Sequence, residues 1–447
     1  MTAPGTSLAQ ELPQIRGKSG ARAGLWVAAT VAGNALEFFD FLTYTFFSVY
    51  IGRAFFPTAN PWTSLLLSLA TFGVGFFTRP LGGILIGAYA DRAGRRPALM
   101  LTIGLMSVGT LALAFTPSYS SIGIAAPLIL VAARLVQGLA LGGEVGPSTA
   151  VLLENASHGR IGAFVSWQIS SQGIAIFAAG ITAVVLSNFL DAGELAAWGW
   201  RVPFALGLLI VPVGLYLRRN LPESLLATES NAHSTPRVLL QLLRVYRRQI
   251  VLAVLVIMSI TITTYVNNFM STYALTTLAM PASAAMWGSL ANGTFNILGG
   301  LAGGWLCDRY GSRVVMIAPR VALMLFIYPA FLLLASERTP WMLCLVTGAN
   351  SILSSLSAAA AMVAIVQVFP NAVRGSGTSI SYAASVSLFG GTTQFVIAWL
   401  IGVTGSPYAP ALYVIATGFA TLWAMWKLPS GETARETARE AAARQSV

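Results

Sequence analysis

The sequence predicts an all-α membrane protein with twelve transmembrane helices arranged in two six-helix halves. Hydrophobic residues make up 56% of its 447 residues and charged residues only 9%, whereas soluble domains carry about 25% charged residues. The mean hydropathy is +0.72, so the folded chain has too little polar surface to stay in water. Twelve helices of ~20 residues would place roughly 240 residues in hydrocarbon, which agrees with the apolar fraction.

Proline, glycine and charge clusters divide the first half into six apolar segments. In order, the segments are residues 24–51, 61–89, 97–115, 122–153, 160–189 and 199–217. The breaks between them are Pro57 to Pro61, the basic turn at 91–96, Pro117, Arg160, and the stretch from Asp191 to Glu194. Each segment is about as long as a membrane-crossing helix needs to be.

The second half repeats this pattern. Its segments are residues 250–279, 284–307, 314–335, 341–368, 375–403 and 408–427. The breaks are Pro281, the turn from Asp308 to Arg313, Glu337 with Arg338, Pro370 and Pro407. The predicted organisation is a tail and first half over residues 1–217, a central cytoplasmic loop over 218–248, a second half over 249–428, and a cytoplasmic tail over 429–447.

Positive charge is distributed unevenly along this pattern. The net charge is +11, and 20 of the 26 Lys and Arg residues fall in the two tails and in the loops on one side of the helices. Only Arg53, Arg201 and Arg338 fall on the other side. Basic residues are retained on the cytoplasmic side, so both termini are predicted to be cytoplasmic. The positive charge is therefore explained by membrane topology and does not indicate binding to nucleic acid. The two cysteines, Cys307 and Cys344, both lie in apolar segments and predict no disulfide framework.

Two loops carry the same motif at corresponding places in the two halves. Residues 87–96 read GAYADRAGRR after the second helix, and residues 304–313 read GWLCDRYGSR after the eighth. Arg160 and Arg374 stand at matching places before the fifth and eleventh helices. One copy would be only a basic turn, but two copies in register indicate parallel halves, an arrangement in which substrate sites lie near the midplane between the halves.

Five segments of the first half carry a further pattern. They are GNALEFFDF at 33–41, RPLGG at 79–83, DRAGRR at 91–96, RLVQGLALGGE at 134–144 and WGWRVPF at 198–204. Together they resemble the major facilitator family, and more closely its metabolite:proton symporter branch. Within that branch, residues 33–57 and SWQISSQ at 166–172 are most similar to the citrate and tricarballylate carriers. The resemblance implies transport driven by the proton gradient, without a cofactor, across a bacterial inner membrane.

Two departures from the resemblance leave the substrate open. Phe38 and Phe39 stand where many members have Trp-Tyr, and the pair Asn267-Asn268 is not recognised from the citrate carriers. Other members of the branch move 2-oxoglutarate, shikimate, or zwitterions such as proline and betaine. These remain the alternatives to a di- or tricarboxylate.

Charged residues inside apolar segments are functional candidates, because a charge at the bilayer centre costs about 2.5–3.5 kcal/mol on insertion scales. Counting 1.5 Å per residue, Arg134 lies ~18 Å down its helix, at a depth comparable to that of Asn34 and Glu37. A guanidinium fork matches a carboxylate bidentately and stays protonated. We therefore expect Arg134, with Gln137 on the same stripe, to bind a substrate carboxylate, and Arg79 either to assist or to be structural.

Three intramembrane carboxylates are candidates for proton coupling: Asp40, Glu37 and Glu144. A carboxylate that alternates between apolar surroundings and a neighbouring arginine can load a proton on one side and release it on the other. A permanent ion pair with Arg134 would leave the same trace in the sequence, and it remains the alternative.

Neutral polar residues are expected to complete the substrate site or, alternatively, to join helices by hydrogen bonds. They are Asn34, Gln168, Gln172, Tyr265, Asn268 and Tyr382. At the cytoplasmic ends, Asp91 and Asp308 are expected to stabilise the N-termini of facing helices and to pair with Arg374 or Arg160, forming a gate. The same loops contribute Arg92, Arg96, Arg309 and Arg313.

The sequence thus predicts a symporter whose partners are a small organic anion, a proton and the lipid bilayer. A drug:proton antiporter is disfavoured by the fixed cation Arg134, and a non-transporting sensor by the short cytoplasmic loops. The sequence shows no metal-ligand spacing, phosphate loop or nucleophile elbow, which disfavours an enzyme. No obligatory protein partner is implied.

Overall fold

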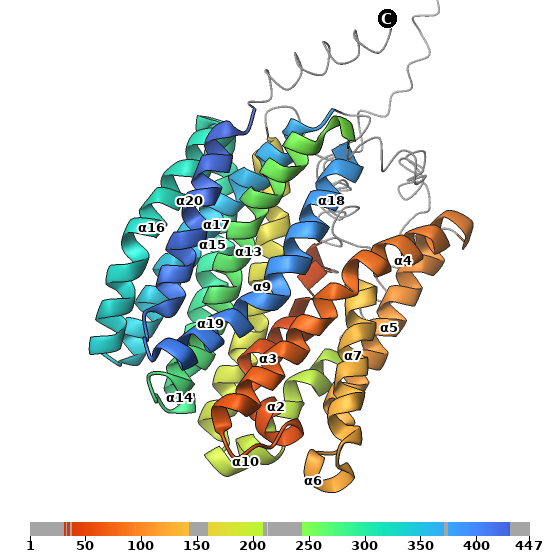
Figure 1. Ribbon diagram of the computed structural model, residues 1–447, viewed down its shortest axis with the longest axis vertical. Coiled ribbons are helices and arrows are strands. Elements are labelled where there is room, and N and C mark those ends of the chain that lie inside the picture. The colour runs from red at the N-terminus through yellow and green to blue at the C-terminus, as the bar shows by residue number, and fades with distance from the viewer. Residues whose placement is uncertain are drawn as a thin grey trace, which may run out of the picture.

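The computed structural model describes four stretches of the chain, all helical or connecting helices (Figure 1). They are residues 31–142 without 33, 36, 37 and 94, residues 160–208 with 212, residues 244–370, and residues 374–429. Helical residues precede the first labelled helix from position 31 onward. The predicted all-helical architecture is confirmed over this part of the chain.

The helices of the first half follow the predicted order. They are α2 (Ser48–Phe55), α3 (Pro61–Phe77), α4 (Arg79–Ala93), α5 (Arg95–Phe115), α6 (Tyr119–Ile122), α7 (Ala125–Leu141), α9 (Ile161–Phe189), α10 (Ala192–Ala197) and the 3₁₀ turn η1 (Gly199–Arg201). The expected single helix over 61–89 is divided by a turn at Thr78. Pro80 explains the division, because proline lacks the N–H that an unbroken helix would use and its ring crowds the preceding turn.

The helices of the second half also follow the predicted order. They are α13 (Arg247–Thr276), α14 (Ala282–Ala285), α15 (Trp287–Tyr310), α16 (Ser312–Ser336), α17 (Pro340–Val368), α18 (Arg374–Ser385), the π turn η3 (Val386–Gly390), α19 (Gly391–Thr404) and α20 (Ala409–Lys427). The expected helix over 375–403 contains η3, a five-residue interruption that the sequence pattern does not predict. Single π turns inside helices occur frequently at functional sites.

Several helix ends use the signals that marked the breaks in the sequence. Asn60 accepts a hydrogen bond from the Trp62 backbone N–H at 2.9 Å, directly before a proline at the first helical position. Thr339 does the same for Met342 at 3.2 Å. Gly311 ends α15 with φ +83°, a conformation that favours glycine.

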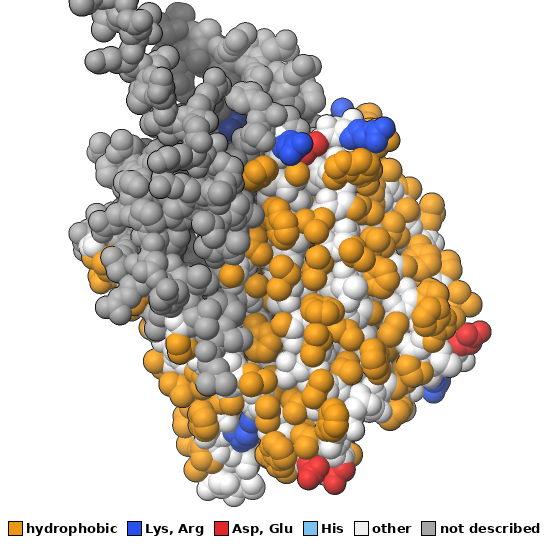
Figure 2. Space-filling model, turned by 180° about the vertical axis from the view of Figure 1, so that it is seen from behind, with side chains coloured by type: hydrophobic (Ala, Val, Ile, Leu, Met, Phe, Trp, Pro, Cys, Tyr) orange, Lys and Arg blue, Asp and Glu red, His pale blue; other side chains and the backbone are white. Residues whose placement is uncertain are grey.

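The surface has the character that contact with lipid requires. Seven helical stretches among the described residues are long and apolar enough to cross a membrane. They are Pro61–Gly87, Ile161–Phe189, Arg247–Thr276, Ser312–Ser336, Pro340–Val368, Ser376–Thr404 and Ala409–Lys427. Hydrophobic side chains cover the middle of the face shown in Figure 2, and charged side chains gather toward its ends. The chain is a multi-pass membrane protein.

The two predicted halves meet along two helix pairs in which glycines bring backbones together. In α9 and α15, an added methyl at Gly162 would lie 2.4 Å from the Gly304 carbonyl oxygen, and one at Gly180 would lie 2.9 Å from the Leu290 nitrogen. In α3 and α19, a methyl at Gly73 would lie 2.5 Å from the Gly391 carbonyl oxygen. Small residues permit this close approach in membranes.

The short helices α6, α10 and α14 all lie toward the same end of the molecule, the lower end in Figure 1. They connect long helices in loops that the charge distribution assigns to the outer side. The opposite end of the molecule, where α18 and α20 reach the top of the view, is therefore the predicted cytoplasmic end.

Candidate functional site

Three charged side chains lie buried inside the first half of the molecule. Asp40 and Arg79 are each 6% exposed, and Arg134 is 0% exposed. Asp40 belongs to the helical stretch before α2, Arg79 begins α4, and Arg134 lies near the middle of α7. A charge taken out of water costs several kcal/mol unless it is compensated, so the partners of these groups decide what the site can do.

Only some of the hydrogen-bond donors of Arg134 have a partner. Its Nη1 donates to Gln137 Oε1 at 2.8 Å, and its guanidinium carbon lies 3.8 Å from the centre of the Tyr44 ring. Its Nε and Nη2 have no hydrogen-bond partner among the described residues. Two donors of a buried guanidinium are thus left for another group.

A chain of hydrogen bonds joins Arg134 to Asp40 through two neutral side chains. Gln137 donates from Nε2 to the Thr110 hydroxyl at 3.1 Å, and the Thr110 hydroxyl donates to Asp40 Oδ2. The other oxygen, Oδ1, has no partner among the described residues and lies against Gly207, where an added methyl would come within 1.9 Å of it. The carboxylate is therefore held on one side only.

Arg79 lies among aromatic rings. Its guanidinium carbon is 4.0 Å from the Phe76 ring centre and 4.8 Å from that of Phe41. The guanidinium also lies within hydrogen-bonding reach of the Tyr265 hydroxyl on α13, whereas its Nε and Nη2 have no partner among the described residues. Arg134 lies 5.6 Å from the same Phe41 ring centre. The two guanidinium carbons are consequently about 10 Å apart at most.

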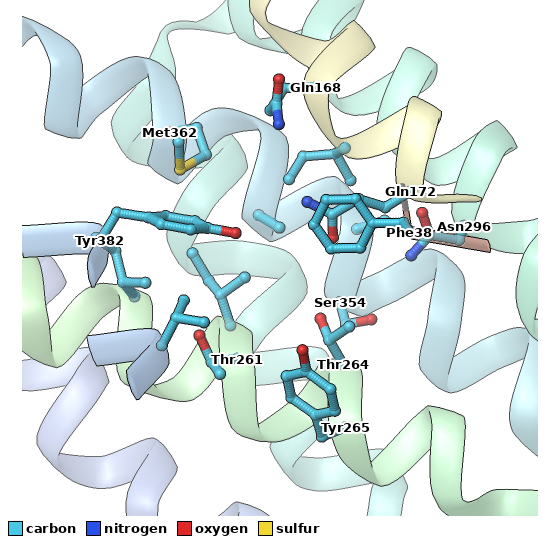
Figure 3. A pocket seen from close by; sticks show the side chains of 16 residues that line it. Phe38, Gln168, Gln172, Thr261, Thr264, Tyr265, Asn296, Ser354, Met362 and Tyr382 are labelled. Carbon is cyan, nitrogen blue, oxygen red and sulfur yellow. The ribbon is translucent and has the colours of Figure 1, made fainter. Parts of the chain in front are cut away.

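A cavity of about 40 Å³, which Tyr265 helps to line, lies between helices of both predicted halves (Figure 3). Gln168 and Gln172 of α9 contribute to its wall, and so does Tyr382 of α18, which is hydrogen-bonded to Gln172. Further polar lining comes from Thr261, Thr264, Asn296, Ser354 and Ser355. A space this small suits water, whereas ligand pockets measure about 300–1,000 Å³.

The structure therefore brings most of the predicted binding residues, and the predicted coupling residue Asp40, into two groups. Arg134, Gln137 and Asp40 form the ionic group, and Gln168, Gln172, Tyr265 and Tyr382 line the cavity. Arg79 connects them through Tyr265.

Two predicted binding residues lie instead in contacts between helices. Asn34 donates to the Ser171 hydroxyl of α9 at 2.5 Å. Asn268 accepts from Asn292 Nδ2 at 2.8 Å, and Asn292 in turn accepts from Ser351 at 2.9 Å, which ties α13, α15 and α17 together. Neither residue lines the cavity.

At the predicted cytoplasmic end, Asp308 meets the N-terminus of α9. Its two carboxylate oxygens accept from the backbone N–H groups of Gly162 at 2.6 Å and Ala163 at 2.9 Å. An anion at a helix N-terminus is stabilised both by these donors and by the helix dipole. Arg160, which directly precedes α9, is exposed.

The other predicted gate residues have different surroundings. Arg374 Nε donates to the Phe369 carbonyl at 3.3 Å, and Arg313 Nη2 donates to the Trp426 carbonyl at 2.7 Å. Arg309 stacks over Trp305 at 5.6 Å. Glu37 and Glu144 lie outside the described residues, and so do the side chains of Asp91, Arg92 and Arg96.

Sequence reasoning did not identify Thr110, Phe41 or Gly207 as parts of the site. A single hydroxyl, phenylalanine or glycine in an apolar helix has no distinctive spacing, so only the packing of separate helices reveals these residues. Among the described residues, no cluster of three or more His, Cys, Asp or Glu side chains could hold a metal ion.

Comparison with known proteins gives family matches that cover most of the chain. The family described as "Sugar (and other) transporter" matches residues 25–241, and the family described as "Major Facilitator Superfamily" matches residues 252–446. A citrate-proton symporter of Klebsiella pneumoniae is 34% identical over 397 residues, which cover 88% of this chain and 89% of the relative.

Other relatives carry different names. A putative proline/betaine transporter of Staphylococcus aureus (strain COL) is also 34% identical over 397 residues, covering 87% of this chain and 84% of the relative. Among solved structures, a D-xylose-proton symporter superimposes with a TM-score of 0.73 at 19% identity, covering 91% of this chain and 98% of that one. At that identity the structural match speaks for the fold alone.

Proposed function

The chain belongs to the major facilitator superfamily, whose members are transporters and not enzymes, and from this premise we propose that it is a proton-coupled symporter for a small organic anion of the di- or tricarboxylate class. Two buried arginines of the predicted first half, Arg79 and Arg134, carry the proposal. They lie about 10 Å apart at most, and each has two nitrogen atoms without a hydrogen-bond partner among the described residues. The relationship to a citrate-proton symporter supports the same substrate class.

The charge balance favours an anion with more than one carboxylate. Two buried guanidinium groups face one described carboxylate, Asp40, which is linked to only one of them. A carboxylate on each arginine would satisfy the free donors by bidentate hydrogen bonds. A zwitterion such as betaine has one carboxylate, so it would leave one arginine unsatisfied and would place its own cation in an already positive site.

Proton coupling is assigned to Asp40, with Glu37 and Glu144 as the alternatives. When a substrate carboxylate binds Arg134, it competes with Gln137 for the guanidinium. The released amide changes its bond to Thr110, the residue that donates to Asp40. Protonation of Asp40 and binding of the anion thereby influence each other, and such influence is reciprocal.

Transport would proceed by alternating access between two six-helix halves, residues 1–217 and 249–428. The cavity of about 40 Å³ has to enlarge before it can take an organic anion. The contact of Asp308 with α9 holds two helices of different halves together at the predicted cytoplasmic end, and Asp91 is proposed to play the same part near α18.

The direct test is uptake of labelled citrate by the purified protein in proteoliposomes. We expect accumulation above the external concentration when an inward proton gradient is imposed, and none when a protonophore dissipates it. Unlabelled tricarballylate should compete, whereas proline and betaine should not. Competition by proline or betaine without competition by any carboxylate would reject the substrate class, and gradient-independent uptake would reject proton coupling.

A further inference from the structure

A basic groove lies far from the buried arginines, between the ends of α13 and α20. It has a volume of about 370 Å³ and is lined by Arg247, Arg248, Val251, Leu252, Trp423 and Lys427. The two helices are fastened below it by a hydrogen bond from the Thr421 hydroxyl to the Leu255 carbonyl at 2.9 Å. The groove is at the predicted cytoplasmic end of the molecule.

The rim of the groove is positively charged and uncompensated along both helices. Arg247, Arg248 and Lys427 are exposed, and neither 244–276 nor 409–429 contains an Asp or Glu residue. A fourth cation, Arg313, lies nearby, since it donates to the Trp426 carbonyl at 2.7 Å. Three converging cations favour a ligand with a phosphate group.

The wall of the groove below this rim is apolar. Val251 is 56% exposed and Trp423 is 55% exposed. Both lie on helices that are long and apolar enough to cross a membrane. Trp426 is 60% exposed beside Lys427, whose Nζ lies 4.7 Å from the centre of the Trp426 ring. Tryptophan is enriched at the level of the lipid headgroups, so Trp426 places the basic rim at headgroup depth. Val251 and Trp423 lie about one helical turn further along their helices, toward the acyl chains.

We propose that this groove binds an anionic phospholipid of the cytoplasmic leaflet. The phosphate lies among Arg247, Arg248 and Lys427, and an acyl chain runs along Val251 and Trp423. Basic pockets between membrane helices on the cytoplasmic side have this chemistry. A free phosphate would use the same cations, but it would gain nothing from the apolar wall. The proposal is independent of which substrate the protein carries.

The test is lipid binding to the purified full-length protein in detergent, measured by titration. The probes are dioleoyl phosphatidylglycerol, dioleoyl phosphatidylcholine and inorganic phosphate. Each cation near a headgroup contributes about a fivefold gain in affinity. The double variant Arg248→Gln with Lys427→Gln should therefore bind phosphatidylglycerol about 25-fold more weakly than the natural chain, and phosphatidylcholine with unchanged affinity.

A matched control removes the same charge elsewhere. Arg53→Gln with Arg338→Gln takes away two exposed cations outside the groove, and it should leave phosphatidylglycerol binding within about twofold of the natural value. Trp423→Ala should weaken phosphatidylglycerol binding while all the cations remain.

Three outcomes would overturn the proposal. They are equal affinity for the two lipids, an equal loss in both double variants, and displacement of phosphatidylglycerol by inorganic phosphate at similar concentrations.

Discussion

Two neutral side chains, Gln137 and Thr110, separate the buried acid Asp40 from the buried base Arg134. In a direct ion pair the two charged groups would be hydrogen-bonded to each other. Here Arg134 Nε and Nη2 and Asp40 Oδ1 have no hydrogen-bond partner among the described residues. The depth of each residue along its helix predicted that Arg134 would lie near the acids of the first helix. The hydroxyl of Thr110 could not be predicted, because its helix reaches Asp40 only through tertiary packing.

The first prediction concerns Arg134. Replacement by Lys keeps a positive charge but removes the bidentate hydrogen-bond donor and the stacking of the guanidinium on the Tyr44 ring. We expect substrate affinity to fall about tenfold or more in Arg134→Lys, a loss of at least ~1.4 kcal/mol, and binding to be undetectable in Arg134→Ala. Equilibrium binding of labelled citrate measures both, with the exposed Arg338→Lys as the control. A correctly inserted Arg134→Ala protein with undiminished affinity would contradict the assigned role.

The second prediction tests the position of Asp40 without changing any charge. A methyl at Gly207 would lie 1.9 Å from Asp40 Oδ1, so Gly207→Ala must displace the carboxylate. Proton-driven uptake should drop about tenfold, the equivalent of ~1.4 kcal/mol. Gly104→Ala is the matched control, because a methyl there meets no atom within 4 Å. If both variants transport equally well, proton-driven uptake does not depend on the position of the Asp40 carboxylate.

At the scale of helices, the ends of the helices were easier to predict from the sequence than the interruptions within them. Proline and charge clusters in the sequence predicted where most helices begin and end. They did not predict the π turn η3 (Val386–Gly390), because its residues 386–389 contain no proline, glycine or charged residue. The turn lies where Gly390 approaches the Phe76 and Tyr265 rings, so close packing against the aromatic group beside Arg79 accompanies the local change in winding.

The third prediction concerns the contact between α15 and α9. Asp308→Asn removes the charge and one of the two acceptors that hold the backbone N–H groups of Gly162 and Ala163. Charge-assisted hydrogen bonds contribute about 1.5–3 kcal/mol, so the population with separated cytoplasmic ends should rise roughly tenfold or more. Spin-label distances between those ends measure the change, and Glu337→Gln at the far end of α16 is the control. Unchanged distances would count against a gate at Asp308.

At the scale of the whole molecule, composition and repetition were enough to predict a helical membrane protein of the transporter family. The family matches and the related fold confirm that prediction. The sequence could not predict how tightly the halves close on each other, because closure depends on which glycines face one another across α3 and α19 or across α9 and α15. It also could not separate Asn268, which joins helices, from Tyr265, which lines the cavity.

The fourth prediction belongs to the complete transport cycle. Asp40→Asn removes the proposed proton carrier but leaves both arginines, so the anion can still cross in exchange for another anion. Uphill uptake driven by a proton gradient should disappear, while exchange of internal for external citrate should persist. Proteoliposomes loaded with unlabelled citrate allow both measurements on one preparation. Retained uphill uptake in this variant would shift the assignment to Glu37 or Glu144.

The small size of the cavity also has a consequence for the rate of substrate binding. The α9–α15 contact runs from Gly162 to Gly180, about 27 Å at 1.5 Å per residue, nearly the ~30 Å thickness of the hydrocarbon core. Among the described residues the cavity is too small for the proposed organic anion, so we expect binding to require that the helices part. Stopped-flow measurements should therefore show an association rate that levels off with rising citrate concentration, at the rate of opening. A rate that rises linearly would mean that the site is already accessible before citrate arrives.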